Sequence, residues 1–406
     1  MREHQEYLVS HLDDIDSAIR ALEKLLMADN RLATKEAGKT LADAIATNSV
    51  LKELDVSENA WSAKQWEAHP DPDDGPGFAK ELADGIKNNG EMTSLNMSNN
   101  SIGKLALPDG WTQKRPTSEE EHEAHEWASE WFEHTDGKWQ KEAPKGSSPV
   151  GAIAIANAIS ANGALVKLLL GANGFKGFEA GKALGDAIAV NTVLKELDIS
   201  GGWRDSEKCD TAFAKGFSPG LGTNGAIVKF DISNNDICAE GGKALAEGAL
   251  FLTRSKQKVP ASAFESIPPS GKRKGKTATF EGKEVRITKA FKTDTVNIEW
   301  DEPKAKGALT KLDASHNSMF GYRDKSGIQA WANALKTNSS LLELNLAKNG
   351  MDGDDAKIFA VGVSANRALT LLNISNSKLT WGKYTNAYGD NDRNDSRNYE
   401  TDMSGL

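Results

Sequence analysis

A short pattern of apolar residues recurs along the chain, in the form apolar-x-x-apolar-x-apolar-x-x-Asn. Apolar and polar residues alternate at its centre, as they do in a strand with one buried side, so each copy predicts a short strand. Gly202 and Ser377 replace the asparagine in two copies. The copies begin at Leu22, Leu51, Met92, Leu165, Leu194, Ile227, Leu309, Leu341 and Leu369.

A helix is predicted after each strand. In residues 36–46, for example, the apolar residues share one face of a 3.6-residue period. They are Ala37, Leu41, Ala44 and Ile45. The smallest spacing between copies is 28 residues, and spacings of 73 and 82 residues after the third and sixth copies indicate two large insertions.

The repeated units are expected to stack into one solenoid. A single strand and helix cannot bury its own apolar face, but neighbouring units can cover each other. The strands should then pair in parallel, with every helix on the same side of the sheet. An inward amide at the end of each strand can bridge backbone groups of adjacent turns, which predicts a structural ladder of Asn30, Asn59, Asn100, Asn173, Asn235, Asn317 and Asn349.

These repeats resemble leucine-rich repeats of the ribonuclease-inhibitor-like class, over roughly two thirds of the chain. The resemblance is carried by motifs such as LKELDISGG, VKFDISNNDICAEGGKALAEGA and LLELNLAKNGMDGDDAKIFAVGVSANRAL. The class includes the GTPase-activating protein of the Ran cycle and the sensor arm of nucleotide-binding immune receptors. The resemblance implies an α/β fold, a leucine-rich-repeat solenoid (horseshoe) of about nine repeats with parallel β-strands on the concave face and helices on the convex face.

The repeat pattern divides the chain into seven expected parts. They are an N-terminal helical cap (1–21), repeats 1–3 (22–102), a Trp-rich acidic insertion (103–149), repeats 4–6 with flanking helices (150–250), a basic insertion with a small β-meander (251–306), repeats 7–9 (307–380) and a polar C-terminal cap or tail (381–406).

The first insertion carries Trp111, Trp131 and Trp139, an acidic stretch at 117–136 and a hairpin predicted around Gly137. Its opening LPDGW and its last tryptophan resemble a WW domain faintly, but the spacing between the aromatic residues is too short. We therefore expect a Trp-rich subdomain that packs on the repeats.

The second insertion has eleven Lys or Arg and three Glu between Thr253 and Lys292. Its alternating segments predict a small meander, with a weak resemblance to part of an SH3-like barrel. Clustered lysines can bind nucleic acid or an anionic membrane, or form a nuclear localisation signal. A solvated linker, or a patch neutralised by the acidic stretch of the first insertion, is the favoured alternative.

Composition narrows the class of protein. The chain has 406 residues, 38% of them hydrophobic, and a formal net charge of -9. Two cysteines cannot form a disulfide framework. The chain has neither a signal peptide at its start nor an apolar run of about 20 residues for a membrane helix. We therefore expect a cytoplasmic protein, with the nucleus as the alternative.

Motifs for catalysis and metal binding are incomplete. His122 and His125 are three residues apart, whereas a zinc-protease helix needs four. Asp390 starts a segment like a calcium loop, but Asp395 stands where that loop needs glycine. The chain has no phosphate-binding loop and no nucleophile elbow. We therefore predict no catalytic residue, no metal site and no cofactor.

The side chains expected on the concave face are the candidate binding residues. Acids and amides without a cation stand one residue before the last apolar residue in most copies, and charges of alternating sign lie two residues earlier. An acidic stripe favours a basic protein partner. The alternative is that these residues only solubilise the face or are inherited from repeat duplication. The predicted partner-binding residues are Glu53, Asp55, Asn96, Glu196, Asp198, Asp231, Asp313, Glu343 and Asn345.

The sequence therefore favours a non-enzymatic scaffold or adaptor that binds a protein on its concave face and insertions. One alternative is a small-GTPase regulator like the Ran-cycle activator, although the acidic tail common in that family is absent. The other alternative is a structural subunit of a larger complex. The partner and the oligomeric state are not encoded in any recognisable motif.

Overall fold

The structure is a computed structural model, and it describes residues 22–32, 34–59, 75–114, 131–140, 145, 147–249, 252–260, 262, 264, 277–280, 283–290, 295–303, 308–321 and 324–379. The expected caps at 1–21 and 381–406 lie outside the described residues. The same holds for His122 and His125, for the segment that starts at Asp390, and for most of the acidic stretch.

The nine repeat copies each contribute one three-residue strand to a single parallel sheet. In order across the sheet the strands are β1 (Lys24–Leu26), β2 (Glu53–Asp55), β3 (Ser94–Asn96), β7 (Lys167–Leu169), β8 (Glu196–Asp198), β9 (Lys229–Asp231), β14 (Lys311–Asp313), β15 (Glu343–Asn345) and β16 (Leu371–Asn373). Strands that are neighbours in the sheet belong to consecutive copies of the repeat, even across the insertions. The predicted α/β solenoid is thereby confirmed.

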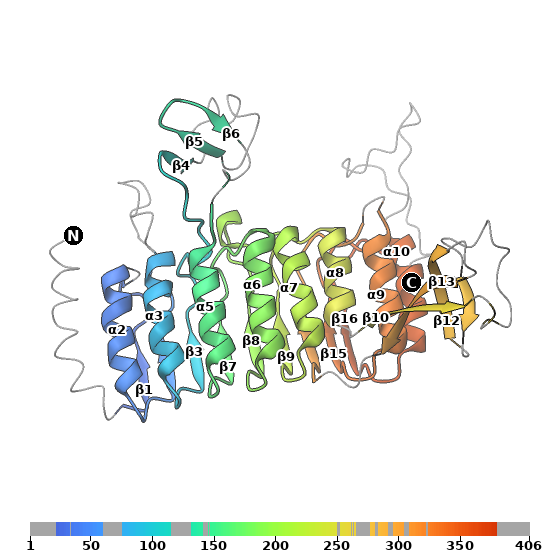
Figure 1. The fold of residues 1–406 in the computed structure, drawn as a ribbon, viewed down its shortest axis with the longest axis horizontal. Coiled ribbons are helices and arrows are strands. Elements are labelled where there is room, and N and C mark those ends of the chain that lie inside the picture. The colour runs from blue at the N-terminus through green and yellow to red at the C-terminus, as the bar shows by residue number, and fades with distance from the viewer. Residues whose placement is uncertain are drawn as a thin grey trace.

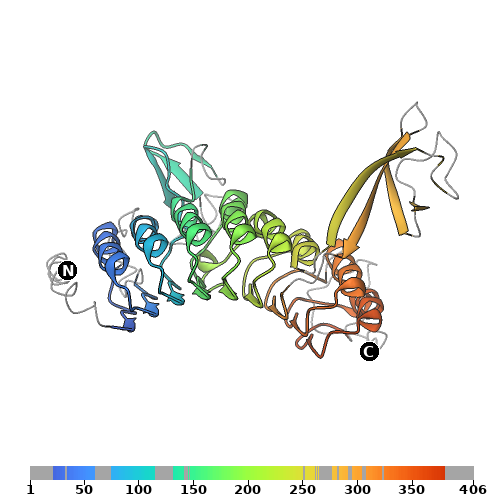
Figure 2. The same ribbon diagram turned by 60° about the horizontal axis from the view of Figure 1, so that its bottom comes forward.

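Helices cover one side of this sheet and leave the other side uncovered, as Figures 1 and 2 show. We call the uncovered side the open face. The helices are α2 (Lys35–Thr47), α3 (Pro76–Asn88), α5 (Val150–Ala161), α6 (Gly177–Val190), α7 (Thr211–Thr223), α8 (Ala239–Ala249), α9 (Ser326–Thr337) and α10 (Gly353–Ala365).

One hydrophobic core runs through the repeats. The middle residue of most strands is buried, and a single cluster of buried side chains extends from Leu41 in α2 to Phe359 in α10. At its centre the rings of four phenylalanines stack in series across consecutive repeats, with centroids 5.3 to 6.1 Å apart. Apart from Leu22 at the start of the first copy, which is exposed, the leucines of the pattern therefore share a continuous interior, as stacking of the units requires.

The predicted asparagine ladder forms at the ends of the strands. Asn100 shows the arrangement: its Oδ1 accepts the Asn59 N–H at 2.9 Å, and its Nδ2 donates to the carbonyls of Val56 and Met97 at 2.8 and 3.0 Å. Its own N–H donates to Oδ1 of Asn173 at 2.8 Å. Asn100 therefore joins its own turn to those of the neighbouring repeats, whereas the side chain of Asn30, in the first repeat, donates only within its own turn.

A second asparagine ladder, which the sequence analysis missed, caps the carboxyl ends of the helices. Asn191 is an example: its Oδ1 accepts the N–H groups of Val193 and Leu194, and its Nδ2 donates to the carbonyls of Ile159 and Asn162 in the preceding repeat. The same position is occupied by Asn48, Asn89, Asn162, Asn224, Asn338 and Asn366. The signal in the sequence is an asparagine three residues before the first apolar residue of a copy.

The insertions contain two small antiparallel sheets. The first has the order β4 (Trp111–Lys114), β5 (Trp131–His134) and β6 (Trp139–Gln140). The second has the order β10 (Leu252–Pro260), β13 (Thr295–Pro303), β12 (Lys283–Ala290) and β11 (Thr277–Phe280), with a hydrophobic cluster of its own. No strand was predicted at β10, and its register places Arg254 opposite Asp301 and Lys256 opposite Glu299.

Candidate functional site

The open face presents two parallel rows of side chains, because the first and third residues of each strand face away from the core. We call the first residues the strand-start row and the third residues the strand-end row. All nine predicted partner-binding residues lie in these rows. Glu53, Asp55 and Asn96 lie on β2 and β3, and β7 separates them from the other six on β8, β9, β14 and β15.

Ion pairs neutralise the glutamates of the strand-start row. Glu53 pairs with Lys24 at 2.8 Å, and Glu343 pairs with Lys311 at 2.6 Å. Glu196 lies between two lysines, Lys167 at 3.5 Å and Lys229 at 3.7 Å. Exposed pairs such as these contribute little to stability, but they leave this row with little net charge.

The strand-end row keeps its negative charge and holds its carboxylates in one orientation. Asp198 and Asp231 each accept the backbone N–H of the serine two residues later through Oδ1, at 2.8 and 2.9 Å. Asp313 does the same at 2.9 Å, and its Oδ2 accepts a hydrogen bond from Asn345 at 2.8 Å. Within the described residues, Oδ2 of Asp198 has no hydrogen-bond donor, and the carboxylate of Asp231 receives a further hydrogen bond from the side chain of Ser233.

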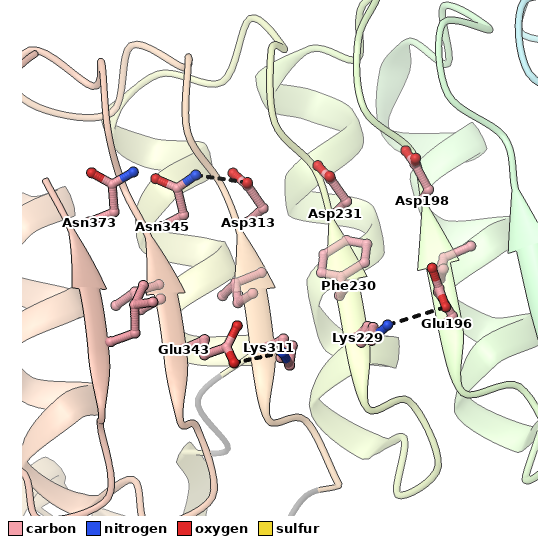
Figure 3. A pocket seen from close by; sticks show the side chains of 14 residues that line it. Glu196, Asp198, Lys229, Phe230, Asp231, Lys311, Asp313, Glu343, Asn345 and Asn373 are labelled. Atoms are coloured by element: carbon pink, nitrogen blue, oxygen red, sulfur yellow. Dashed lines mark hydrogen bonds and ion pairs between the residues drawn. The ribbon is translucent and has the colours of Figure 1, made fainter. Parts of the chain in front are cut away.

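The register of the sheet places Asp198, Asp231 and Asp313 side by side (Figure 3). We call these three residues the aspartate row. Adjacent strands are about 4.8 Å apart, and no lysine or arginine of the described residues forms an ion pair with any of the three. Burial, together with the charges of its two neighbours, raises the pKa of Asp231 to about 6. The site therefore favours any group that brings positive charge.

A hollow of about 370 Å³ lies over the open face from β8 to β16. The aspartate row lines it along one side and the strand-start row along the other, as Figure 3 shows. Leu371, 51% exposed, adds an apolar patch at the end of the hollow. Its length across five strands suits an extended segment of chain better than a compact small molecule.

Comparison with known proteins agrees with this architecture. A family model described as Leucine Rich repeat matches residues 227–246 and 337–360. Each match covers one strand of the sheet and the start of the helix that follows it.

The chain is a leucine-rich-repeat protein.

No curated protein matches this leucine-rich-repeat chain. Solved structures match it with low identity. An internalin from Listeria monocytogenes is 10% identical, with 92% of this chain and 89% of that chain covered and a TM-score of 0.28. The tropomodulin C-terminal domain from Caenorhabditis elegans is 9% identical, with 53% and 92% covered and a TM-score of 0.31. Actin-binding site 2 of leiomodin-1 is 14% identical, with 46% and 76% covered and a TM-score of 0.27.

These TM-scores do not show a common overall arrangement, and the matched family model describes leucine-rich repeats in general. The ribonuclease-inhibitor-like class therefore stays a resemblance of the sequence. Within the described residues, no three His, Cys, Asp or Glu side chains come together as metal ligands. No helix of that part of the chain is both long and apolar enough to cross a bilayer.

The sequence analysis missed two features of the open face. The first is the serine that holds each carboxylate, although the motif Asp-x-Ser is legible in four copies, such as Asp198 and Ser200. The second is Trp203, whose side chain is 99% exposed. Trp203 follows Gly202, which stands where the repeat pattern has asparagine. This departure from the pattern was the signal in the sequence that could have pointed to Trp203.

Proposed function

We propose that this leucine-rich-repeat protein is a non-enzymatic interaction scaffold whose open face binds a protein through basic residues of that partner. The observation that carries the proposal is the aspartate row. Three carboxylates lie side by side, held by backbone hydrogen bonds, and none has a cationic partner among the described residues.

The contrast between the two rows supports a basic partner. The glutamates of the strand-start row already pair with lysines of the same face. The aspartate row lacks such pairs, and burial and like charge disfavour its ionised form at Asp231. An incoming cation relieves both costs, and a complementary charge of this kind mainly sets association rate and specificity. Rigid repeats also suit a binding surface, because stacking fixes the positions of the side chains.

A triple charge reversal tests the proposal. The wild-type chain and the variant D198K/D231K/D313K are immobilised, and proteins retained from a lysate of the source organism are quantified by mass spectrometry. A matched control, D43K/D84K/D186K, changes the net charge equally on exposed positions of α2, α3 and α6.

The proposal predicts that partners enriched on the wild-type chain are lost from the aspartate-row variant and kept by the control, while circular dichroism shows all three folded. Equal capture by all three proteins would contradict it. The native mass of the endogenous complex then distinguishes a free adaptor from a fixed subunit of a larger assembly.

A further inference from the structure

Trp203 is a fully exposed aromatic side chain on the rim of the solenoid. It is 99% exposed, more than any other large hydrophobic side chain of the described residues. It lies in the loop between β8 and α7, at the carboxyl ends of the strands. Single exposed apolar side chains are common, but a bare tryptophan on a fixed loop is typical of the residues that dominate binding energy in interfaces.

Hydrogen bonds hold the loop that presents Trp203. Nδ2 of Asn234 donates to the carbonyls of Gly201 and Gly202, both at 2.9 Å. The backbone N–H of Arg204 donates to Oε2 of Glu207 at 3.2 Å, and the Arg204 guanidinium donates to Oε1 at 3.3 Å. The backbone that carries Trp203 is therefore held in place before any partner arrives, which reduces the entropy that binding must overcome.

The same loop places Trp203 close to the aspartate row. It begins directly after β8, and Trp203 comes five positions after Asp198, a path of at most about 18 Å. The N–H of Gly201 donates to the carbonyl of Ser233 at 2.8 Å, two residues beyond Asp231. An extended segment of about five or six residues is long enough to reach from the indole to the carboxylates.

We propose that an arginine-bearing, extended segment of a partner protein docks across the carboxyl ends of β8 and β9. One guanidinium of this segment stacks on the face of Trp203, and another binds the carboxylates of Asp198 and Asp231. This inference rests on the proposed function and names the class of its partner. Charge complementarity selects a cationic segment, and the indole selects arginine over lysine. A guanidinium is planar and weakly hydrated, so it stacks on an aromatic ring and also forms paired hydrogen bonds with a carboxylate.

The test uses two labelled peptides, fluorescein–octa-arginine and fluorescein–octa-lysine, with binding to the full chain followed by fluorescence anisotropy. We expect octa-arginine to bind the wild-type chain more tightly than octa-lysine. In Trp203→Ala the affinity for octa-arginine should fall about fivefold or more, and the preference for arginine over lysine should become smaller, because only the paired hydrogen bonds with the carboxylates remain. Trp203→Phe should retain most of the affinity, because phenylalanine keeps an aromatic face.

Phe178→Ala is the matched control, because Phe178 is an exposed aromatic residue of α6 on the helical side. It should leave both affinities unchanged. The inference is overturned if Trp203→Ala stays within twofold of the wild type for octa-arginine, or if it weakens both peptides equally.

The variant D198K/D231K/D313K separates this inference from the proposed function. If that variant loses octa-arginine while Trp203→Ala retains it, the aspartate row binds basic segments and only the role of Trp203 is wrong. If neither change affects octa-arginine binding, both proposals are wrong. Loss in both variants supports both. Because the described residues leave Trp203 99% exposed, its replacement should not disturb the fold, and a melting curve equal to that of the wild type should accompany the result.

Discussion

Replacing Asn100 by alanine should destabilise the whole solenoid, because this buried amide joins two turns of the backbone. The substitution removes the acceptor of the Asn59 N–H and the donor to the carbonyls of Val56 and Met97. Each of the two carbonyls keeps another amide donor, from Asn59 and Asn173 respectively. The Asn59 N–H loses its only hydrogen-bond acceptor within the described residues.

The expected loss of stability follows from this difference between the Asn59 N–H, which loses its acceptor, and the two carbonyls, which keep a donor. A buried donor left without an acceptor costs about 1–3 kcal/mol, and each of the two lost bonds to a still-bonded carbonyl costs about 0.5–1 kcal/mol. The free energy of unfolding should therefore fall by about 2–5 kcal/mol. Asn30 is the matched control, since it occupies the same position in the first repeat but is exposed, and within the described residues its side chain donates only to the carbonyl of Ala28. Asn30→Ala should cost less than about 0.5 kcal/mol.

Urea unfolding followed by circular dichroism at 222 nm measures both variants. The reasoning predicts a clear loss for Asn100→Ala and almost none for Asn30→Ala. If Asn100→Ala unfolds at the same urea concentration as the wild type, or if the two variants lose equally, the ladder is not what holds adjacent turns together.

Three further changes probe other parts of the molecule. Burial and neighbouring carboxylates raise the pKa of Asp231 to about 6, so its folded form binds a proton more tightly than its unfolded form, and stability falls as the pH rises from about 4 to 6. Asp231→Asn should therefore raise the free energy of unfolding by up to about 3 kcal/mol at pH 7.5 and leave it unchanged at pH 4. Equal changes at both pH values would count against a raised pKa of Asp231 as the cause. Partial burial opposes ionisation of Cys238, but hydrogen bonds from a neighbouring hydroxyl and from the first N–H groups of α8 outweigh that effect and lower the pKa of Cys238. Burial raises the pKa of the other thiol, Cys209. Iodoacetamide should then modify one thiol per native chain, at Cys238, and mass spectrometry that finds Cys209 modified first would disprove it. A Cβ on Gly220 would lie 1.9 Å from a backbone oxygen of α6, whereas one on Gly163 would meet nothing within 4 Å. Gly220→Ala should therefore lower the melting temperature, with a loss of about 1–3 kcal/mol in the free energy of unfolding, and Gly163→Ala should not. Equal melting curves for the two variants would refute the close approach of α6 and α7.

The repeat pattern was sufficient to predict the fold because its buried positions depend only on local periodicity. Leu54, Leu197 and Leu344 lie at the centre of their strands and in the common core, as the alternation required. The ladder at the strand ends was predictable for the same reason. The ladder at the helix ends was equally regular, but its asparagines lie outside the apolar pattern and were overlooked.

The open face was predictable in outline only. The sequence placed the acids and the charges of alternating sign in two rows, but it did not show that Glu196 lies between Lys167 and Lys229. Which acids stay unpaired depends on which repeats become neighbours once the insertions are skipped. Trp203 could not be placed, because its loop is a local departure from the repeat and follows no periodicity.

Hydrogen–deuterium exchange of the full chain, with and without the partner recovered on it, tests the central claim most directly. The account predicts that binding slows exchange at the strand ends and following loops of β8, β9 and β14, including the loop of Trp203, and leaves the outer surfaces of the helices unchanged. Protection confined to the helices or to the two inserted sheets would show that the partner binds elsewhere.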